Sequence, residues 1–151
     1  MKKTLTAAQI GCGKFARSQD FPNMAKHPDV TLKWACDVNP DNAKTAAEQF
    51  HVPETTTDFM EVVNDPEVDM IKIATTHEAH LPIIEAAAKA GKHIFCEKPM
   101  AKHDKEAYLI MKAVRRNGEH PVAAFGPYGA GLPGRNLIQE VVIHVFLLLP
   151  H

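Results

Sequence analysis

The amino-acid sequence predicts an α/β fold built on a doubly wound parallel sheet, within a domain that spans residues 1–125. Two observations support this prediction. Short apolar runs alternate with helical segments, which is the pattern of βαβ units around a sheet that is buried on both faces. A glycine-rich turn also lies between the first apolar run and the first helical segment. Right-handed crossovers between such units then produce the doubly wound arrangement.

The first half of the chain is expected to hold two strands and three helices. Pro22 falls inside the first helical segment and must bend or split it, because proline lacks the N–H that a helix interior uses. Asn39 and Pro40 are typical of a helix start, as the capping residue and the first helical residue. In order, the elements are a strand at Leu5–Ile10, a helix from Lys14 to about Lys26, a strand at Thr31–Cys36, a helix from Asn39 to about Phe50 and a short helix from Asp58 to about Asn64.

The second half continues the alternation with three strands and two helices. Gly91 follows an alanine-rich segment and is typical of a helix end. Lys72 interrupts a run that should form a fully buried central strand, so its ammonium either faces a carboxylate or extends to an edge. In order, the elements are a strand at Met70–Thr75, a helix from Glu78 to Ala90, a strand at His93–Cys96, a helix from Asp104 to Arg116 and a strand at Val122–Phe125.

The composition of the chain changes at its end. Phe125–Asn136 holds four glycines and two prolines among twelve residues, which is typical of a loop. The apolar segment Val141–Leu149 follows. We therefore predict an atypical tail at residues 126–151, after the domain at residues 1–125. Because an apolar segment should not stay exposed, we expect self-association into a homo-oligomer, in the simplest case a dimer.

Composition and charge exclude several classes of function. The formal net charge is −1, which gives no electrostatic footprint for nucleic acid. No apolar run reaches the roughly 18 residues of a spanning helix, so we expect no membrane insertion. Three cysteines without a CxxC pair are typical of reduced thiols, and we expect a cytoplasmic chain.

The glycine-rich turn has the form GxGxxA at residues 11–16, between a strand and a helix. Gly11 permits the tight turn, Gly13 lets the backbone approach a pyrophosphate, and Ala16 lets the helix pack closely against the strand. The helix start then directs free N–H groups at the phosphates. This pattern is that of a Rossmann-like dinucleotide site, with Lys14 and Phe15 inside it. The alternative is a tight turn that binds nothing.

Asp37 ends the second strand about 20 residues after the glycine turn, as a dinucleotide-binding unit requires. A carboxylate there can accept hydrogen bonds from both ribose hydroxyls of NAD, and it would repel the 2′-phosphate of NADP. We therefore predict NAD as the cofactor, in preference to NADP. The alternative is an aspartate that only caps the turn into Asn39-Pro40.

Polar residues follow the third and fourth strands, at the edge where parallel sheets bind ligands. Thr75, His77 and His80 could line the cofactor cleft there, or could be a capping threonine and surface histidines. The two histidines form an HxxH pair, but no neighbouring ligand completes a set, so we predict no metal site. Glu97-Lys98-Pro99 follows the fourth strand, and Lys98 could act as an acid or base in a semi-buried cleft.

Together these segments resemble the Gfo/Idh/MocA family of NAD(P)-dependent oxidoreductases. The resemblance covers about Leu5 to Val122. It is carried by GCGKFA, the strand end at Asp37, ATTHEAH, and above all AGKHIFCEKPMA at residues 90–101.

The resemblance implies roles for several residues. Lys98 would lie beside the nicotinamide and the substrate, with Glu97 next to it, and Thr75, His77 and His80 would contact the cofactor or the cleft. Thr76 and His77 stand where the family usually has Pro and Asn.

The resemblance also implies a substrate-binding second domain, an open antiparallel sheet that carries a catalytic His. We expect this domain to be largely missing. Gly126–Gly129 differs from the family's Arg-Arg-Phe-like linking segment, whereas residues 136–148 are similar to the helix that bears the His, at His144. An internal deletion, a disrupted reading frame and a random apolar tail stay open as explanations.

Three functions compete. The first is an NAD-dependent oxidoreductase that transfers a hydride between the nicotinamide and a sugar, inositol or other polyol-type substrate, with Lys98 and His144 as catalytic residues. The second is a non-catalytic NAD-binding module or the remnant of such an enzyme. The third, a metal or redox-thiol protein, rests only on scattered Cys and His residues. We expect NAD binding with little or no turnover.

Overall fold

The computed structural model describes residues 4–116 and 123–125. Strands and helices alternate along this part of the chain, as predicted. The strands are β1 (Leu5–Ile10), β2 (Val30–Cys36), β3 (Glu54–Thr56), β4 (Met70–Ile73), β5 (His93–Cys96) and β6 (Ala123–Phe125). The helices are η1 (Ala16–Asp20), α1 (Phe21–Ala25), α2 (Pro40–Phe50), α3 (Phe59–Asn64), α4 (His77–Lys89) and α5 (Asp104–Arg116). The predicted tail at residues 126–151, with His144 and the apolar segment, lies outside the described residues.

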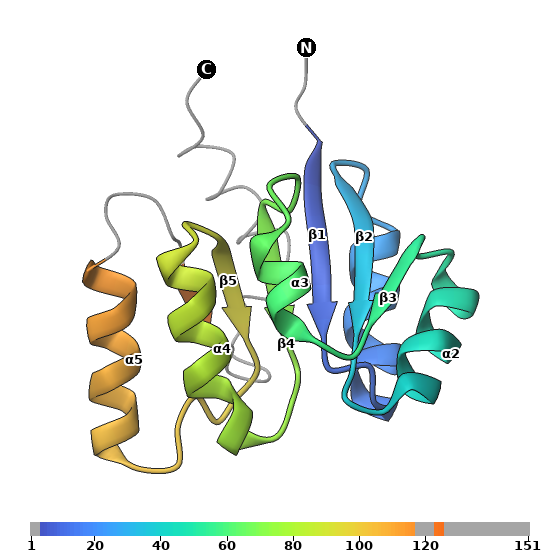
Figure 1. Cartoon of the computed structure of the whole chain (residues 1–151). Coiled ribbons are helices and arrows are strands. Elements are labelled where there is room, and N and C mark those ends of the chain that lie inside the picture. The colour runs from blue at the N-terminus through green and yellow to red at the C-terminus, as the bar shows by residue number, and fades with distance from the viewer. Residues whose placement is uncertain (1–3, 117–122, 126–151) are drawn as a thin grey trace, which may run out of the picture.

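The six strands form one sheet in the order β3-β2-β1-β4-β5-β6, and every neighbouring pair is parallel. Helices α3, α4 and α5 lie in front of the sheet in Figure 1, and the first helical segment lies behind it. The chain order reverses direction between β1 and β4, which defines a doubly wound sheet. The predicted fold class is confirmed.

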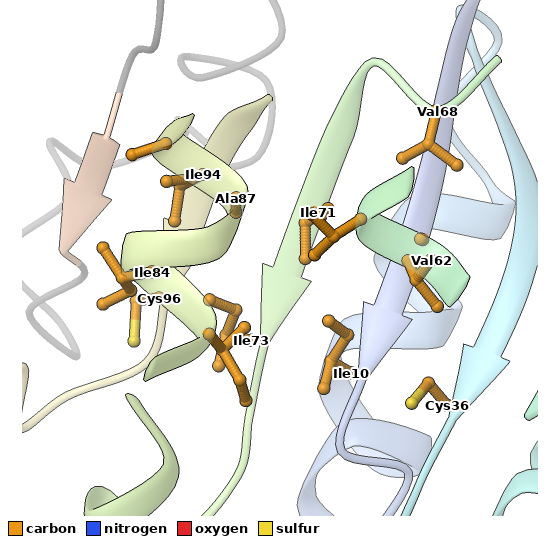
Figure 2. Packing of buried hydrophobic residues seen from close by; sticks show 14 of the residues in the cluster. Ile10, Cys36, Val62, Val68, Ile71, Ile73, Ile84, Ala87, Ile94 and Cys96 are labelled. Carbon is orange, nitrogen blue, oxygen red and sulfur yellow. The ribbon is translucent and has the colours of Figure 1, made fainter. Parts of the chain in front are cut away.

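The core on the α3–α4 face joins alternate residues of the central strands to the apolar sides of the helices. Ile10, Ile71 and Ile73 point from the sheet toward Val62 of α3 and Ile84 of α4 (Figure 2). All five side chains are at most 3% exposed. Burying an aliphatic side chain of this size contributes about 1.5–3 kcal/mol, so this layer fixes the register of β1 and β4.

Strand β3 was not predicted from the sequence. It has three residues, Glu54–Thr56, and it pairs only with β2 at the edge of the sheet. Its side chains are exposed or half-buried, so the apolar run that marks a buried strand is absent. Short polar edge strands of this kind discourage pairing with other chains.

The first helical segment runs from Lys14 to Ala25 and contains a π-helical turn at Ala16–Asp20. Pro22 follows directly and occupies the first turn of α1. A proline inside a continuous α-helix would clash with the carbonyl four residues earlier, and the wider π turn is one known way to accommodate such a break. The prediction that Pro22 bends or splits the helix is confirmed.

Polar side chains mark the starts of two helices, as expected from the sequence. The Asn39 side chain accepts a hydrogen bond from the N–H of Asp41 at 3.0 Å, and Asp58 accepts from the N–H of Met60 at 2.9 Å. Gly91 follows α4 with φ +71°, the conformation expected of a glycine after a helix. None of the helices in residues 4–116 is both long and apolar enough to cross a membrane.

Candidate cofactor site

The glycine turn after β1 brings the ends of β1 and β4 into close contact. Gly11 has φ +91°, and a Cβ added there would overlap the carbonyl of Ala74. A Cβ on Gly13 would instead meet no protein atom within 4 Å, so the space beside Gly13 is open. Gly11 is therefore required by the fold itself, whereas the absence of a side chain at Gly13 leaves room for another molecule.

Asp37 lies at the end of β2 and ties the glycine turn to the start of α2. One carboxylate oxygen accepts a hydrogen bond from the N–H of Cys12 at 2.8 Å, and the other accepts from the N–H of Asn39 at 2.8 Å. Asp37 thus caps the turn into α2, which was the alternative interpretation of this residue. Each carboxylate oxygen has two acceptor positions, so both oxygens can accept a further hydrogen bond.

A cavity of about 420 Å³ lies at the carboxyl ends of β1, β2 and β4. Most of its wall is apolar, and its polar groups come from the glycine turn, from Asp37 and from Thr57, Thr75 and Thr76. Its size and its few convergent polar groups are those of a small-molecule site. The lining residues are Ile10, Gly11, Gly13, Cys36, Asp37, Val38, Thr57, Phe59, Ala74, Thr75, Thr76, Ala79, Pro82 and Ile83.

Only some of the predicted cofactor residues line this cavity. Those that do are Gly11, Gly13, Asp37 and Thr75. Of the remaining turn residues, Lys14 and Phe15 are exposed and Ala16 is buried in the core. The buried position of Ala16 matches the close packing of helix on strand that was expected of it. The others, His77, His80, Glu97 and Lys98, lie outside the cavity wall.

His80 is buried in α4 and contacts the segment after Lys98-Pro99. Its Nδ1 lies 3.3 Å from the carbonyl oxygen of Met100, and its ring meets that of His77 edge-on, with the centroids 5.8 Å apart. The side chain is 1% exposed, so it is not a surface histidine. Within the described ranges, no three His, Cys, Asp or Glu residues are grouped so that they could hold a metal ion.

Lys98 itself is exposed, whereas Glu97 beside it is half-buried and forms an ion pair with Lys72. Lys72 is fully buried in β4 and also pairs with Asp20, with 3.3 Å between nitrogen and oxygen. Lys72 therefore faces carboxylates, which was one of the two possibilities left open by the sequence. Burial raises the pKa of Asp20 to about 6, although the ammonium of Lys72 opposes this rise.

All three cysteines of the chain are buried and free. Burial raises the pKa of all three thiols, to about 12 for Cys36 and Cys96. The negative charge of Asp37 adds to this rise at Cys12 and Cys36. Thiols held in this way stay protonated and are poor nucleophiles and poor metal ligands.

Several residues of the cavity wall were missed by the sequence analysis. Val38, Phe59 and Pro82 belong to three different segments, and the sequence does not show that they meet. In the sequence, Val38 directly follows the strand-end aspartate, and in the structure this valine is 89% exposed.

The fold and the cavity define a nucleotide-binding domain of the doubly wound α/β class. Residues 5–124 match the family model described as "Oxidoreductase family, NAD-binding Rossmann fold", and the chain belongs to this Gfo/Idh/MocA family. The resemblance noted from the sequence is thus confirmed.

Named relatives act on sugars and inositols. The chain is 39% identical over 92 residues to levoglucosan dehydrogenase of Pseudarthrobacter phenanthrenivorans, covering 60% of this chain and 24% of that protein. It is 40% identical over 91 residues to inositol 2-dehydrogenase/D-chiro-inositol 3-dehydrogenase of Lactiplantibacillus plantarum, covering 60% and 25%. An uncharacterized oxidoreductase of Bacillus subtilis is 30% identical over 118 residues, covering 78% and 34%. The chain therefore spans between about a quarter and about a third of the length of these relatives.

Solved structures share the fold. Levoglucosan dehydrogenase in complex with NADH and levoglucosan superimposes with a TM-score of 0.70 at 30% identity, covering 81% of this chain and 35% of that one. The apo scyllo-inositol dehydrogenase from Lactobacillus casei gives 0.77 at 26% identity, covering 83% and 37%.

Proposed function

We propose that this chain binds NAD in the cavity at the carboxyl ends of β1, β2 and β4, as the cofactor-binding part of an oxidoreductase for a sugar, inositol or other polyol-type substrate. One observation carries the proposal: the open space beside Gly13 and the carboxylate of Asp37 belong to the same cavity. The levoglucosan and inositol dehydrogenases among the relatives support the substrate class.

The glycine turn fits the pyrophosphate of a dinucleotide. The space beside Gly13 would admit phosphate oxygens close to the backbone, and a side chain there would fill it. The helical segment begins at Lys14, so the positive end of its dipole lies next to this space. These two features favour an anionic group at the turn.

Asp37 and the apolar wall fit the adenosine half. The carboxylate would accept hydrogen bonds from ribose hydroxyls with the acceptor positions that Cys12 and Asn39 leave available. Phe59, Val38 and Pro82 would cover the faces of a flat base. A 2′-phosphate beside Asp37 would meet a like charge, and for this reason we propose NAD rather than NADP.

Lys98 is proposed to act on the substrate hydroxyl. NAD, when bound, would supply the acceptor for a hydride from the carbinol carbon of a substrate. The amine form of Lys98, which is exposed after β5, would take up the proton of the hydroxyl, or its ammonium would donate a hydrogen bond to the hydroxyl oxygen. His144, proposed as a second catalytic residue, lies outside the described residues.

The second candidate is NAD binding without hydride transfer. It is favoured by the placement of Lys98 outside the cavity wall. Transfer needs the reacting atoms held about 3–3.5 Å apart, which requires groups on both sides of the substrate.

Calorimetry tests the proposal directly. NAD should bind in preference to NADP, because like-charge opposition in a desolvated site costs several kcal/mol. Equal or tighter binding of NADP would contradict the assignment of Asp37. The production of NADH from a panel of simple polyols and sugars then separates the oxidoreductase from the binding module.

A further inference from the structure

Lys72 occupies a position where a charge is unexpected. It lies in the middle of β4, in register with Gln9 of β1 and Phe95 of β5, and its side chain is fully buried. An unpaired ammonium at such a site would cost far more than one apolar contact could return. The partners of Lys72 therefore determine its function.

Those partners come from two segments that are distant in the sequence. The ammonium pairs with Asp20 at the end of η1 and with Glu97 directly after β5. It also lies over the ring of Phe95, 4.1 Å from the centroid. Two carboxyl groups therefore pair with one ammonium, and together they restrict its position.

Hydrogen bonds extend this ion-pair cluster to the glycine turn. The side-chain NH₂ of Gln9 donates to the carbonyl of Gly11 at 3.0 Å and to Asp20 at 3.4 Å. A buried polar chain thus runs from Gly11 through Gln9 and Asp20 to Lys72 and Glu97. Its two ends lie at the glycine turn and at Glu97, the neighbour of Lys98.

We propose that Lys72 is a positioning residue, which holds Glu97, and with it the backbone at Lys98, at a fixed place relative to the glycine turn. Any effect of Lys72 on the position of a bound nicotinamide rests on the proposed function. Its effect on the loop at residues 97–101 does not depend on that function. Lys72 lies outside the cavity wall. It is connected to Lys98 through Glu97 and to the glycine turn through Asp20 and Gln9.

Lys72→Met tests this role, because methionine keeps most of the unbranched apolar stem of lysine and removes the ammonium with its hydrogen-bond donors. Lys92→Met is the matched control. Lys92 is also a buried lysine, but it lies before β5, and its ammonium donates to the carbonyls of Asp65 at 2.6 Å and Val68 at 2.8 Å. Both variants should lose stability, but only Lys72→Met should increase the mobility of the loop at residues 97–101.

Hydrogen exchange of the free full chain is the first measurement. After correction for exchange by global unfolding, the backbone N–H groups within residues 97–101 should exchange about tenfold faster in Lys72→Met than in the parent. In Lys92→Met, their exchange rates should be unchanged. Unchanged loop exchange in Lys72→Met, or equal acceleration in both variants, would overturn the proposal and leave Lys72 with a general role in stability. Should Lys72→Met fail to fold, Glu97→Ala removes the same link while Lys72 keeps Asp20, and the same loop should exchange faster.

Fluorescence of NADH and binding of ADP-ribose form the second measurement. In Lys72→Met, ADP-ribose affinity should stay within about threefold of the parent, while emission of added NADH should move toward that of the free cofactor. A general loss of stability would not separate the two ligands. If the parent chain binds neither ligand, the proposed function fails, and hydrogen exchange still decides whether Lys72 positions the loop.

Discussion

At the scale of single residues, the two glycines of the turn after β1 have different tasks. Gly11 adopts a positive φ and touches the backbone of Ala74, so the fold requires it. Gly13 meets no protein atom where a side chain would be, and only a ligand would require it to be glycine. Substitutions at these two positions therefore separate folding from binding.

Gly13→Val should keep the fold and abolish binding of NAD, because the new side chain would fill the space left for the pyrophosphate. Circular dichroism and calorimetry measure the two effects. Gly11→Ala is the contrasting variant and should destabilise the domain by several kcal/mol through backbone overlap and strain. Binding of NAD by Gly13→Val at nearly the parent affinity would show that the motif is only a turn.

Asp37→Ala should relax the preference for NAD over NADP, mainly by weakening NAD. It should also cost about 1–3 kcal/mol of stability, because the N–H groups of Cys12 and Asn39 lose their acceptor. Asp37→Asn keeps an acceptor oxygen and helps separate the two effects. An unchanged affinity ratio in both variants, measured by calorimetry, would mean that Asp37 serves only as a cap.

The sequence predicted the residues of the site unevenly. The glycine turn and Asp37 were recognisable, because their chemistry depends on short spacing along the chain. The contacts of Lys72 were not, since Asp20 and Glu97 come close to it only after the sheet forms. The apolar wall of Phe59 and Pro82 was hidden for the same reason.

At the scale of elements, strands buried in the sheet were predictable and the edge strand was not. β1, β2, β4 and β5 show apolar runs because the sheet is covered by helices, whereas the polar Glu54–Thr56 lies at an uncovered edge. The π turn at Ala16–Asp20 was also beyond prediction, although Pro22 signalled a break. Pro22 predicts an irregularity in the helix, whereas the kind of turn that forms there depends on packing.

The first helical segment is joined to β4 through the ion pair of Asp20 and Lys72, and this contact should depend on pH. Burial raises the folded-state pKa of Asp20 from 3.8 to about 6, against the effect of Lys72, while the charge of Glu97 adds to the rise. The folded protein therefore binds this proton more tightly than the unfolded chain. The associated stability is present below about pH 4 and is lost as the pH rises through 6.

Asp20→Asn removes this proton equilibrium and tests the sign. The free energy of unfolding of the parent, minus that of Asp20→Asn, should fall by about 2 kcal/mol between pH 4 and pH 7. Denaturant unfolding at several pH values measures it. A difference that is constant or rises over this interval would show that the ion pair with Lys72 outweighs the burial of the carboxylate.

At the scale of the whole molecule, the described residues form a doubly wound domain with the proposed NAD cavity at the carboxyl ends of β1, β2 and β4. The chain spans 24–34% of the length of the three curated relatives compared above, and their substrates and activities reach it only as proposals. The 151-residue chain should bind NAD with little or no turnover, because Lys98 alone cannot enclose a substrate. Steady formation of NADH from a simple polyol, lost in Lys98→Ala, would contradict this prediction.

Self-association of the 151-residue chain stays a prediction of the sequence, as does a cytoplasmic location. The apolar segment Val141–Leu149 should pack on the domain or on a second copy, and light scattering should therefore show a dimer. A monodisperse monomer at micromolar concentration would contradict the expectation of self-association.

The three buried thiols have a practical consequence: a reagent can label them only when the structure around them opens, so labelling would measure opening motions of the protein. Alkylating reagents attack the thiolate, which burial suppresses at Cys12, Cys36 and Cys96, so the native protein should resist modification and air oxidation near neutral pH. Cys12 belongs to the glycine turn and Cys96 to the end of β5. The order in which they become labelled would therefore reveal whether the glycine turn or the end of β5 opens first.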